Sequence, residues 1–80
     1  MNKFEVGKVY GAYESGIDPI RVLKRTDRMC LVTNGHKPWR MLIRQDGAED
    51  ECMYESHVSK LAQEMYRWST KFEEKDWTIY

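Results

Sequence analysis

The pattern of apolar and polar residues divides the chain near position 56. Before this point, short stretches rich in β-branched and aromatic residues alternate with residues that favour turns, as in short antiparallel strands. The first stretch is interrupted by Gly7 and Gly11, and such glycines often mark a bulge or bend. We expect strands within residues 4–13 and at residues 20–25, 29–33, 39–44 and 51–54.

Turn residues separate these segments. Residues 15–19 combine a glycine with a proline, whose nitrogen cannot pair in a sheet. Asn34 and Gly35 give the strongest short hairpin signal, because both residues accept the left-handed backbone conformation. Asp46 and Gly47 predict a further turn. Five strands with a hairpin in the middle predict a small five-stranded antiparallel barrel of the SH3-like kind.

Alternation along the strands assigns side chains to the two faces of this barrel. If Ile20 and Val22 point inward, Arg21 and Arg25 point outward. The same rule for the fourth strand gives two sets. The inward set is Trp39, Met41 and Ile43, and the outward set is Arg40, Leu42 and Arg44.

From Ser56 onward the apolar period lengthens from two to about 3.6 residues. This period predicts an amphipathic helix over 56–75, with Ser56 as its N-cap. Its apolar stripe is expected to dock on the barrel, although the heptad spacing also permits pairing with a second copy in a homodimer. The stripe consists of Val58, Leu61, Met65, Trp68 and Phe72.

These elements predict a single domain over 1–80 with an α+β, mainly β fold. It comprises a barrel over 1–55, a helix over 56–75 and a tail over 76–80 that either frays or pairs at a sheet edge. A chain of 80 residues with 41% hydrophobic content supports a small core, which buries about 60% of the unfolded surface.

The opening segment resembles a known group of proteins. Residues 4–10, Phe-Glu-Val-Gly-Lys-Val-Tyr, and the Arg25-Thr26 pair before a β-branched strand are similar to small proteins from plasmids and phages of gut bacteria. These share a Phe-x-Val-Gly-Lys-x-Tyr opening and a later Arg-Thr pair. The resemblance covers about the first half of the chain. It implies a compact β-barrel and a mobile-element origin, and it carries over no functional residue.

Charge is segregated along the chain although the formal net charge is zero. Residues 20–44 contain seven basic residues and one acidic residue, a net charge of +6, and residues 45–56 contain five acids and no base, a net charge of −5. The candidate basic contacts, with one aromatic among them, are Arg21, Arg25, Arg28, Lys37, Trp39, Arg40 and Arg44. The candidate acidic contacts are Asp46, Glu49, Asp50, Glu51 and Glu55.

Two binding functions are consistent with this charge pattern. Complementary surfaces rich in Trp, Tyr, Met and Arg favour a protein partner. With the mobile-element resemblance, they predict a protein-binding module that inhibits a bacterial defence or host nucleic-acid enzyme, as anti-CRISPR proteins do. Alternatively, the basic residues bind nucleic acid, although a pI near 6.7 lies below the value typical of such proteins. The same residues could also form a solvated face that only prevents edge aggregation.

The sequence gives little support for catalysis or for a cofactor. Cys30, His36, Cys52 and His57 contain no close cysteine pair of the kind that structural zinc sites use. Nucleophile and phosphate-loop motifs are missing, so we expect a non-enzymatic protein without metal. No signal peptide or membrane span is visible, and we expect a cytoplasmic location in a bacterial cell. A Cys30–Cys52 disulfide is possible only in an oxidising compartment.

Overall fold

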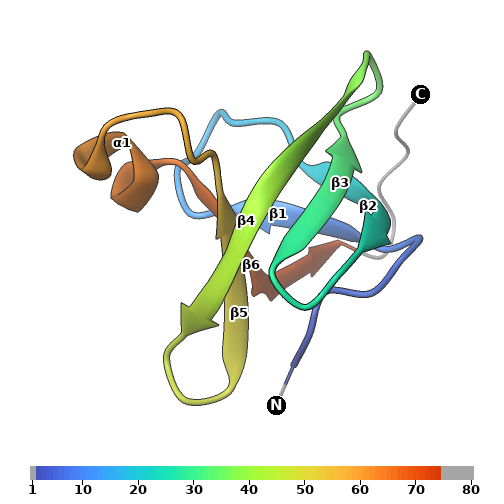
Figure 1. Cartoon of the computed structure of the whole chain (residues 1–80), viewed down its shortest axis with the longest axis horizontal. Coiled ribbons are helices and arrows are strands. Elements are labelled where there is room, and N and C mark those ends of the chain that lie inside the picture. Colours follow the sequence, from blue (N-terminus) through green and yellow to red (C-terminus); the bar gives the residue numbers. More distant parts are fainter. Residues whose placement is uncertain (1, 75–80) are drawn as a thin grey trace.

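Consecutive strands follow one another around a closed antiparallel barrel (Figure 1). The computed structural model describes residues 2–74. Within them the barrel closes because the last strand pairs with both the first and the fifth. The strands are β1 (Val9–Ala12), β2 (Ile20–Arg25), β3 (Met29–Thr33), β4 (Pro38–Asp46), β5 (Asp50–Tyr54) and β6 (Arg67–Glu74), and the helix is α1 (Lys60–Met65).

The predicted mainly β fold is confirmed, but the predicted number of strands is not, since six strands form the barrel of the described chain. β2 and β3 have the bounds that the sequence predicted. The Asn34-Gly35 turn also lies where expected, because Thr33 of β3 pairs with Pro38 of β4 and Gly35 has a positive φ of 102°, which glycine tolerates without strain.

The prediction of a helix over 56–75 was wrong. α1 contains only six residues, none of them buried, and its N-cap is Ser59, whose hydroxyl oxygen accepts a hydrogen bond from the Ala62 N–H at 3.2 Å. The following residues form β6. Trp68 and Phe72 are four residues apart, a spacing that fits both a helix and an alternating strand. Pairing of β6 with strands on both sides outweighs the local helical pattern.

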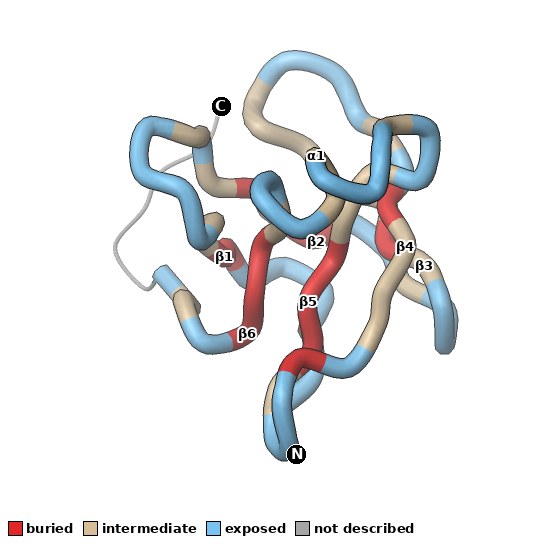
Figure 2. Tube along the Cα trace, turned by 90° about the vertical axis from the view of Figure 1, so that its left-hand side faces the viewer, coloured by how far each residue is buried: buried red, intermediate tan, exposed pale blue. Residues whose placement is uncertain are grey.

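The apolar stripe of the predicted helix therefore does not exist as a single surface. Leu61 and Met65 lie on α1 and are 70% and 41% exposed, whereas Trp68 lies on β6 and is 7% exposed. Figure 2 shows this contrast, with buried segments along β5 and β6 and exposed or intermediate residues along α1. Helix-mediated dimerisation through this stripe loses its geometric basis. The tail over 76–80 lies outside the described residues.

The inward assignments for β2 and β4 are confirmed. The outward assignment does not hold at Arg25, because the β2–β3 register shifts between Val22 and Lys24 and brings Arg25 opposite the buried Cys30. Ile20, Val22 and Met41 are buried, and Trp39 and Ile43 pack against the core while remaining partly exposed. Burial of such apolar area is the main force that holds the barrel together. The buried cluster contains Phe4, Tyr10, Ile20, Val22, Cys30, Val32, Met41, Met53 and Trp68.

The N-terminal segment covers one end of the barrel. The Phe4 ring packs edge-on against Tyr10, with ring centroids 4.7 Å apart. The Phe4 N–H donates to the Glu51 carboxylate at 2.9 Å, and the Arg25 guanidinium donates to the Phe4 carbonyl at 3.0 Å. The N-terminus lies at the end of the molecule opposite the β3–β4 turn (Figure 1). That second end, beside the turn, contains a pocket.

Candidate binding pocket and charged surfaces

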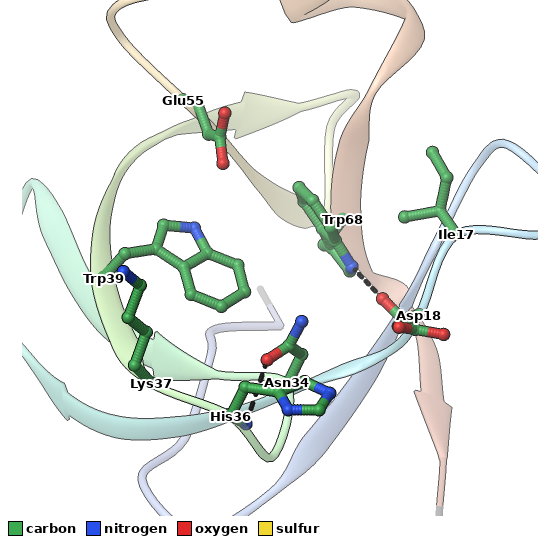
Figure 3. A pocket seen from close by; sticks show the side chains of 8 residues that line it. All are labelled: Ile17, Asp18, Asn34, His36, Lys37, Trp39, Glu55 and Trp68. Carbon is green, nitrogen blue, oxygen red and sulfur yellow. Dashed lines mark hydrogen bonds between the residues drawn. The ribbon is translucent and has the colours of Figure 1, made fainter.

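Two tryptophan side chains, Trp39 and Trp68, form the walls of a pocket beside the β3–β4 turn (Figure 3). The pocket has a volume of about 440 Å³, within the range of cavities that take small ligands or partner side chains. Its lining residues are Ile17, Asp18, Asn34, His36, Lys37, Trp39, Glu55 and Trp68.

The strands hold the two indoles in place. Trp68 lies on β6 opposite Met53 of β5, and its Nε1–H donates to the Asp18 carbonyl oxygen at 2.9 Å. Trp39 lies on β4 opposite Val32 of β3. Its Nε1 atom is buried and has no hydrogen-bond partner among residues 2–74. Both rings are thus positioned by the sheet before any ligand arrives, which limits the entropy lost on binding.

Polar groups from separate loops surround the two indoles. Asp18 belongs to the β1–β2 connection, Asn34 and His36 belong to the β3–β4 turn, and Glu55 follows β5. The Asn34 side-chain oxygen accepts a hydrogen bond from the His36 N–H at 3.2 Å, which orders the turn. In Figure 3, Glu55 lies on one side of the gap between the indoles, and Asn34 and His36 lie on the other.

Sequence reasoning named four of the lining residues but assigned them to three separate surfaces. Lys37 and Trp39 were placed in the basic surface, Glu55 in the acidic surface and Trp68 in the helix stripe. The remaining lining residues come from distant parts of the chain, and only the closure of the barrel brings them together. No local pattern marks such a site. The one available signal was that Trp39 points inward while its neighbour Arg40 points outward, which separates the aromatic residue from the arginines.

The structure divides the predicted basic residues into two groups. Arg21, Arg25 and Arg44 have acceptors within the chain: Arg21 donates to the Gly7 carbonyl at 2.6 Å, Arg25 pairs with Glu51 at 2.9 Å, and Arg44 pairs with Glu64 at 2.5 Å. Three others form no ion pair within residues 2–74; these are Arg28, Lys37 and Arg40.

A row across three strands collects part of the free positive charge. Lys24 of β2 and Arg40 of β4 lie on either side of Leu31 of β3, and they line a hollow of about 320 Å³ together with Arg25 and Met29. Lys24 was not among the predicted contacts and also has no acidic partner within residues 2–74. We call this surface, made of Lys24, Leu31 and Arg40, the cationic row.

The predicted acidic surface is not assembled as one exposed face. Asp46 and Glu51 are buried, Asp50 accepts hydrogen bonds from the Asn2 and Thr70 side chains at 2.9 Å each, and Glu55 lines the pocket. Glu49 alone of the five is exposed without a side-chain partner in the described part of the chain. The acids of residues 46–55 therefore stabilise the barrel, because most of them accept hydrogen bonds within it.

Asp46, the last residue of β4, is linked to Tyr13, which follows β1, and to residues of β6. The Tyr13 and Ser69 hydroxyls donate to its carboxylate, Ser69 at 2.7 Å, and the Arg67 and Lys71 side chains approach it to 3.5 and 4.0 Å. Burial acts to raise the pKa of Asp46, but the hydrogen bonds from Tyr13 and Ser69, with the charges of Lys71 and Arg67, outweigh burial and lower that pKa. This carboxylate is a structural anion.

The cysteines and histidines considered as zinc ligands are not assembled into a metal site within residues 2–74. No group of three or more histidine, cysteine or acidic side chains there has the geometry to hold a metal ion. Cys30 and Cys52 are both free and buried, and burial raises the pKa of the Cys30 thiol to about 11. Within the same residues, no helix is long and apolar enough to cross a membrane.

The fold and the pocket together define a small closed β-barrel with a tryptophan-walled cavity at one end. No family model, curated protein or solved structure matches this chain.

Proposed function

We propose that the protein is a non-enzymatic binding module that takes a side chain of a protein partner between Trp39 and Trp68. One observation carries this proposal: two indoles, each held by a strand, line a pocket of about 440 Å³ beside the β3–β4 turn. Tryptophan is enriched among residues that dominate the binding energy of protein interfaces.

The rim of the pocket supports a protein ligand. Apolar walls with a few convergent polar groups are typical of recognition pockets. Here Asp18, Asn34, His36 and Glu55 provide those polar groups from turns and loop ends, where binding residues are commonly placed on a rigid scaffold. A peptide offers both an apolar side-chain stem for the indoles and main-chain groups for this rim.

The resemblance of residues 4–10 to mobile-element proteins adds a hypothesis about the partner's biology. A phage or plasmid protein of this size would act as an inhibitor of a bacterial defence or host nucleic-acid enzyme. The SH3-like barrel type stays a prediction alongside it. Both hypotheses are independent of the pocket proposal, which depends only on the geometry of the tryptophans.

A random peptide library displayed on phage tests the proposal. Selection on the purified protein should enrich peptides that bind wild-type protein and lose about tenfold or more in affinity on Trp39→Ala protein. The matched control is Arg40→Ala, which changes the neighbouring residue on the outer face of β4. Peptides that bind all three proteins equally, or a library that yields no binder, would refute the proposal.

The cationic row supports nucleic acid as a second candidate ligand. Lys24 and Arg40 are free of acidic partners in residues 2–74 and share one face with an apolar residue between them. A labelled single-stranded oligonucleotide should then be retained at low salt, with a log–log salt slope that falls by about 1 for each cation removed. Lys24→Ala and Arg40→Ala should each reduce the slope. Arg44→Ala, which removes a residue already paired with Glu64, is the control and should leave the slope unchanged.

A further inference from the structure

The tryptophan rings that line the pocket differ from the tyrosines of the chain in having no lysine or arginine of residues 2–74 stacked on them. Indole is the aromatic ring that attracts a cation most strongly. The protein uses this interaction elsewhere on tyrosines, since Arg67 lies 4.4 Å from the ring centroid of Tyr13 and Arg44 lies 5.2 Å from that of Tyr54. Within residues 2–74, no cation lies over Trp39 or Trp68. The partly exposed ring of Trp39 and the small exposed part of Trp68, which is 7% exposed, therefore remain available.

Two carboxylates complement these rings. Asp18 and Glu55 line the same pocket, and neither forms an ion pair with a lysine or arginine within residues 2–74. The one ionic neighbour of Glu55 is His57, at 3.6 Å, whose side chain is largely exposed. Against the two acids the pocket has one lysine, Lys37, so the lining carries a net charge of −1 with neutral histidines. A cation that enters meets aromatic walls and a negative rim.

The geometry points to an arginine side chain of the partner as the occupant of this pocket, an inference that rests on the binding function proposed above. A guanidinium group is planar, stacks on aromatic faces and is more weakly hydrated than an ammonium group, so its transfer into the pocket costs less. Its five N–H donors match acceptors on more than one side, because Glu55 and Asn34 lie on opposite sides of the gap (Figure 3).

A nucleobase is the main competing occupant, since two aromatic rings also stack bases. The charges of the rim disfavour it. Asp18 and Glu55 would repel the phosphates on either side of a stacked base. Lys37 is a single cation among the pocket residues, unpaired within residues 2–74, whereas Lys24 and Arg40 lie on the outer sheet face. An arginine side chain and a nucleobase should therefore differ measurably in their affinity for the pocket.

Titrations followed by ¹H–¹⁵N NMR test the inference. The Nε1–H signals of Trp39 and Trp68 report directly on the pocket, and Trp77→Phe assigns the third indole signal. The probe is the blocked tripeptide acetyl-Gly-Arg-Gly-amide. Its uncharged counterpart has citrulline, an isostere of arginine, at the central position. We expect saturable shifts with arginine, and binding weaker by about tenfold for citrulline, in line with the strength of a partly desolvated cation–π contact. The lysine tripeptide should lie between them.

Rim variants separate charge recognition from simple burial. Asp18→Asn combined with Glu55→Gln should weaken arginine binding by about fivefold or more and reduce its salt dependence. Lys37→Ala should strengthen it, because a like charge is removed. Lys3→Ala, which changes an exposed lysine outside the pocket lining, is the control and should change nothing. These residues are exposed or partly exposed, and unchanged NMR dispersion verifies that each variant folds.

The outcomes distinguish failure of the inference from failure of the proposed function. Equal binding of the citrulline and arginine tripeptides, or tighter binding of adenosine monophosphate than of arginine, overturns the arginine assignment. If library peptides without arginine still require Trp39, the protein-binding function stands and only the occupant is wrong. If neither the tripeptides nor any library peptide shifts the indole signals, both are refuted.

Discussion

Asp46 shows how one residue can reverse its predicted role. In the sequence it belongs to an acidic stretch that suggests a surface for a partner. In the structure it is 7% exposed and accepts hydrogen bonds from Tyr13 and Ser69. A buried carboxylate is tolerated only when donors and positive charges compensate for lost water. Tyr13, just after β1, supplies a donor, and β6 supplies a second donor and the positive charges.

The pH dependence of folding stability, compared between wild type and an Asp46 variant, tests whether Asp46 acts as a buried carboxylate that stabilises the barrel. Because the pKa of Asp46 is lowered in the folded state, the stability that it provides is present above its unfolded pKa of about 3.9 and is lost as pH falls through the lower folded value. Asp46→Asn should cost about 1–3 kcal/mol at pH 6, and this difference from wild type should shrink at pH 3. Urea unfolding at both pH values measures it. A difference independent of pH would contradict the assignment.

Among the elements, α1 and β6 show the limit of predicting secondary structure from the spacing of apolar residues. The sequence predicted both as one helix, in which Leu61 and Trp68 would share a buried stripe. In the structure Leu61 is 70% exposed and Trp68 is 7% exposed. The predicted helix and the observed α1–β6 arrangement therefore predict different losses of folding stability when Leu61 and Trp68 are replaced.

Leu61→Ala should change the free energy of unfolding by no more than about 0.5 kcal/mol, as surface substitutions usually do. Trp68→Ala should cost about 3–5 kcal/mol, because it removes a large side chain from the core. Urea denaturation followed by circular dichroism gives both values. Comparable large losses for the two variants would instead restore the predicted helix stripe.

The sequence predicted well those elements whose signals are local. β-branched residues define β2 and β3, and Asn34-Gly35 defines their neighbouring hairpin. β6 was missed because its identity depends on pairing with β1 and β5, strands more than a dozen residues away in the chain. The pocket was missed for the same reason: Trp39 and Trp68 line one pocket only after the barrel closes, and no spacing in the sequence indicates that they do so.

For the whole molecule, closure is the decisive feature, because a closed barrel leaves no unpaired edge strand of the kind that promotes aggregation. A chain ending at Met65 lacks β6 and should show neither dispersed NMR signals nor a cooperative urea transition. A control in which Lys60–Met65 are replaced by six glycine and serine residues should still fold, since α1 buries none of its residues. A folded truncated chain would show that β6 is dispensable.

The division of the pocket into strand-borne walls and loop-borne rim has a consequence for how such a protein can diversify. Substitutions at Asp18, Asn34, His36 and Glu55 fall outside the strands, so they can alter what is recognised while the hydrogen-bonded framework and its folding remain intact. The barrel would then serve as a constant scaffold for variants that bind different partners. Randomising these four positions offers a direct route to engineered variants with new targets.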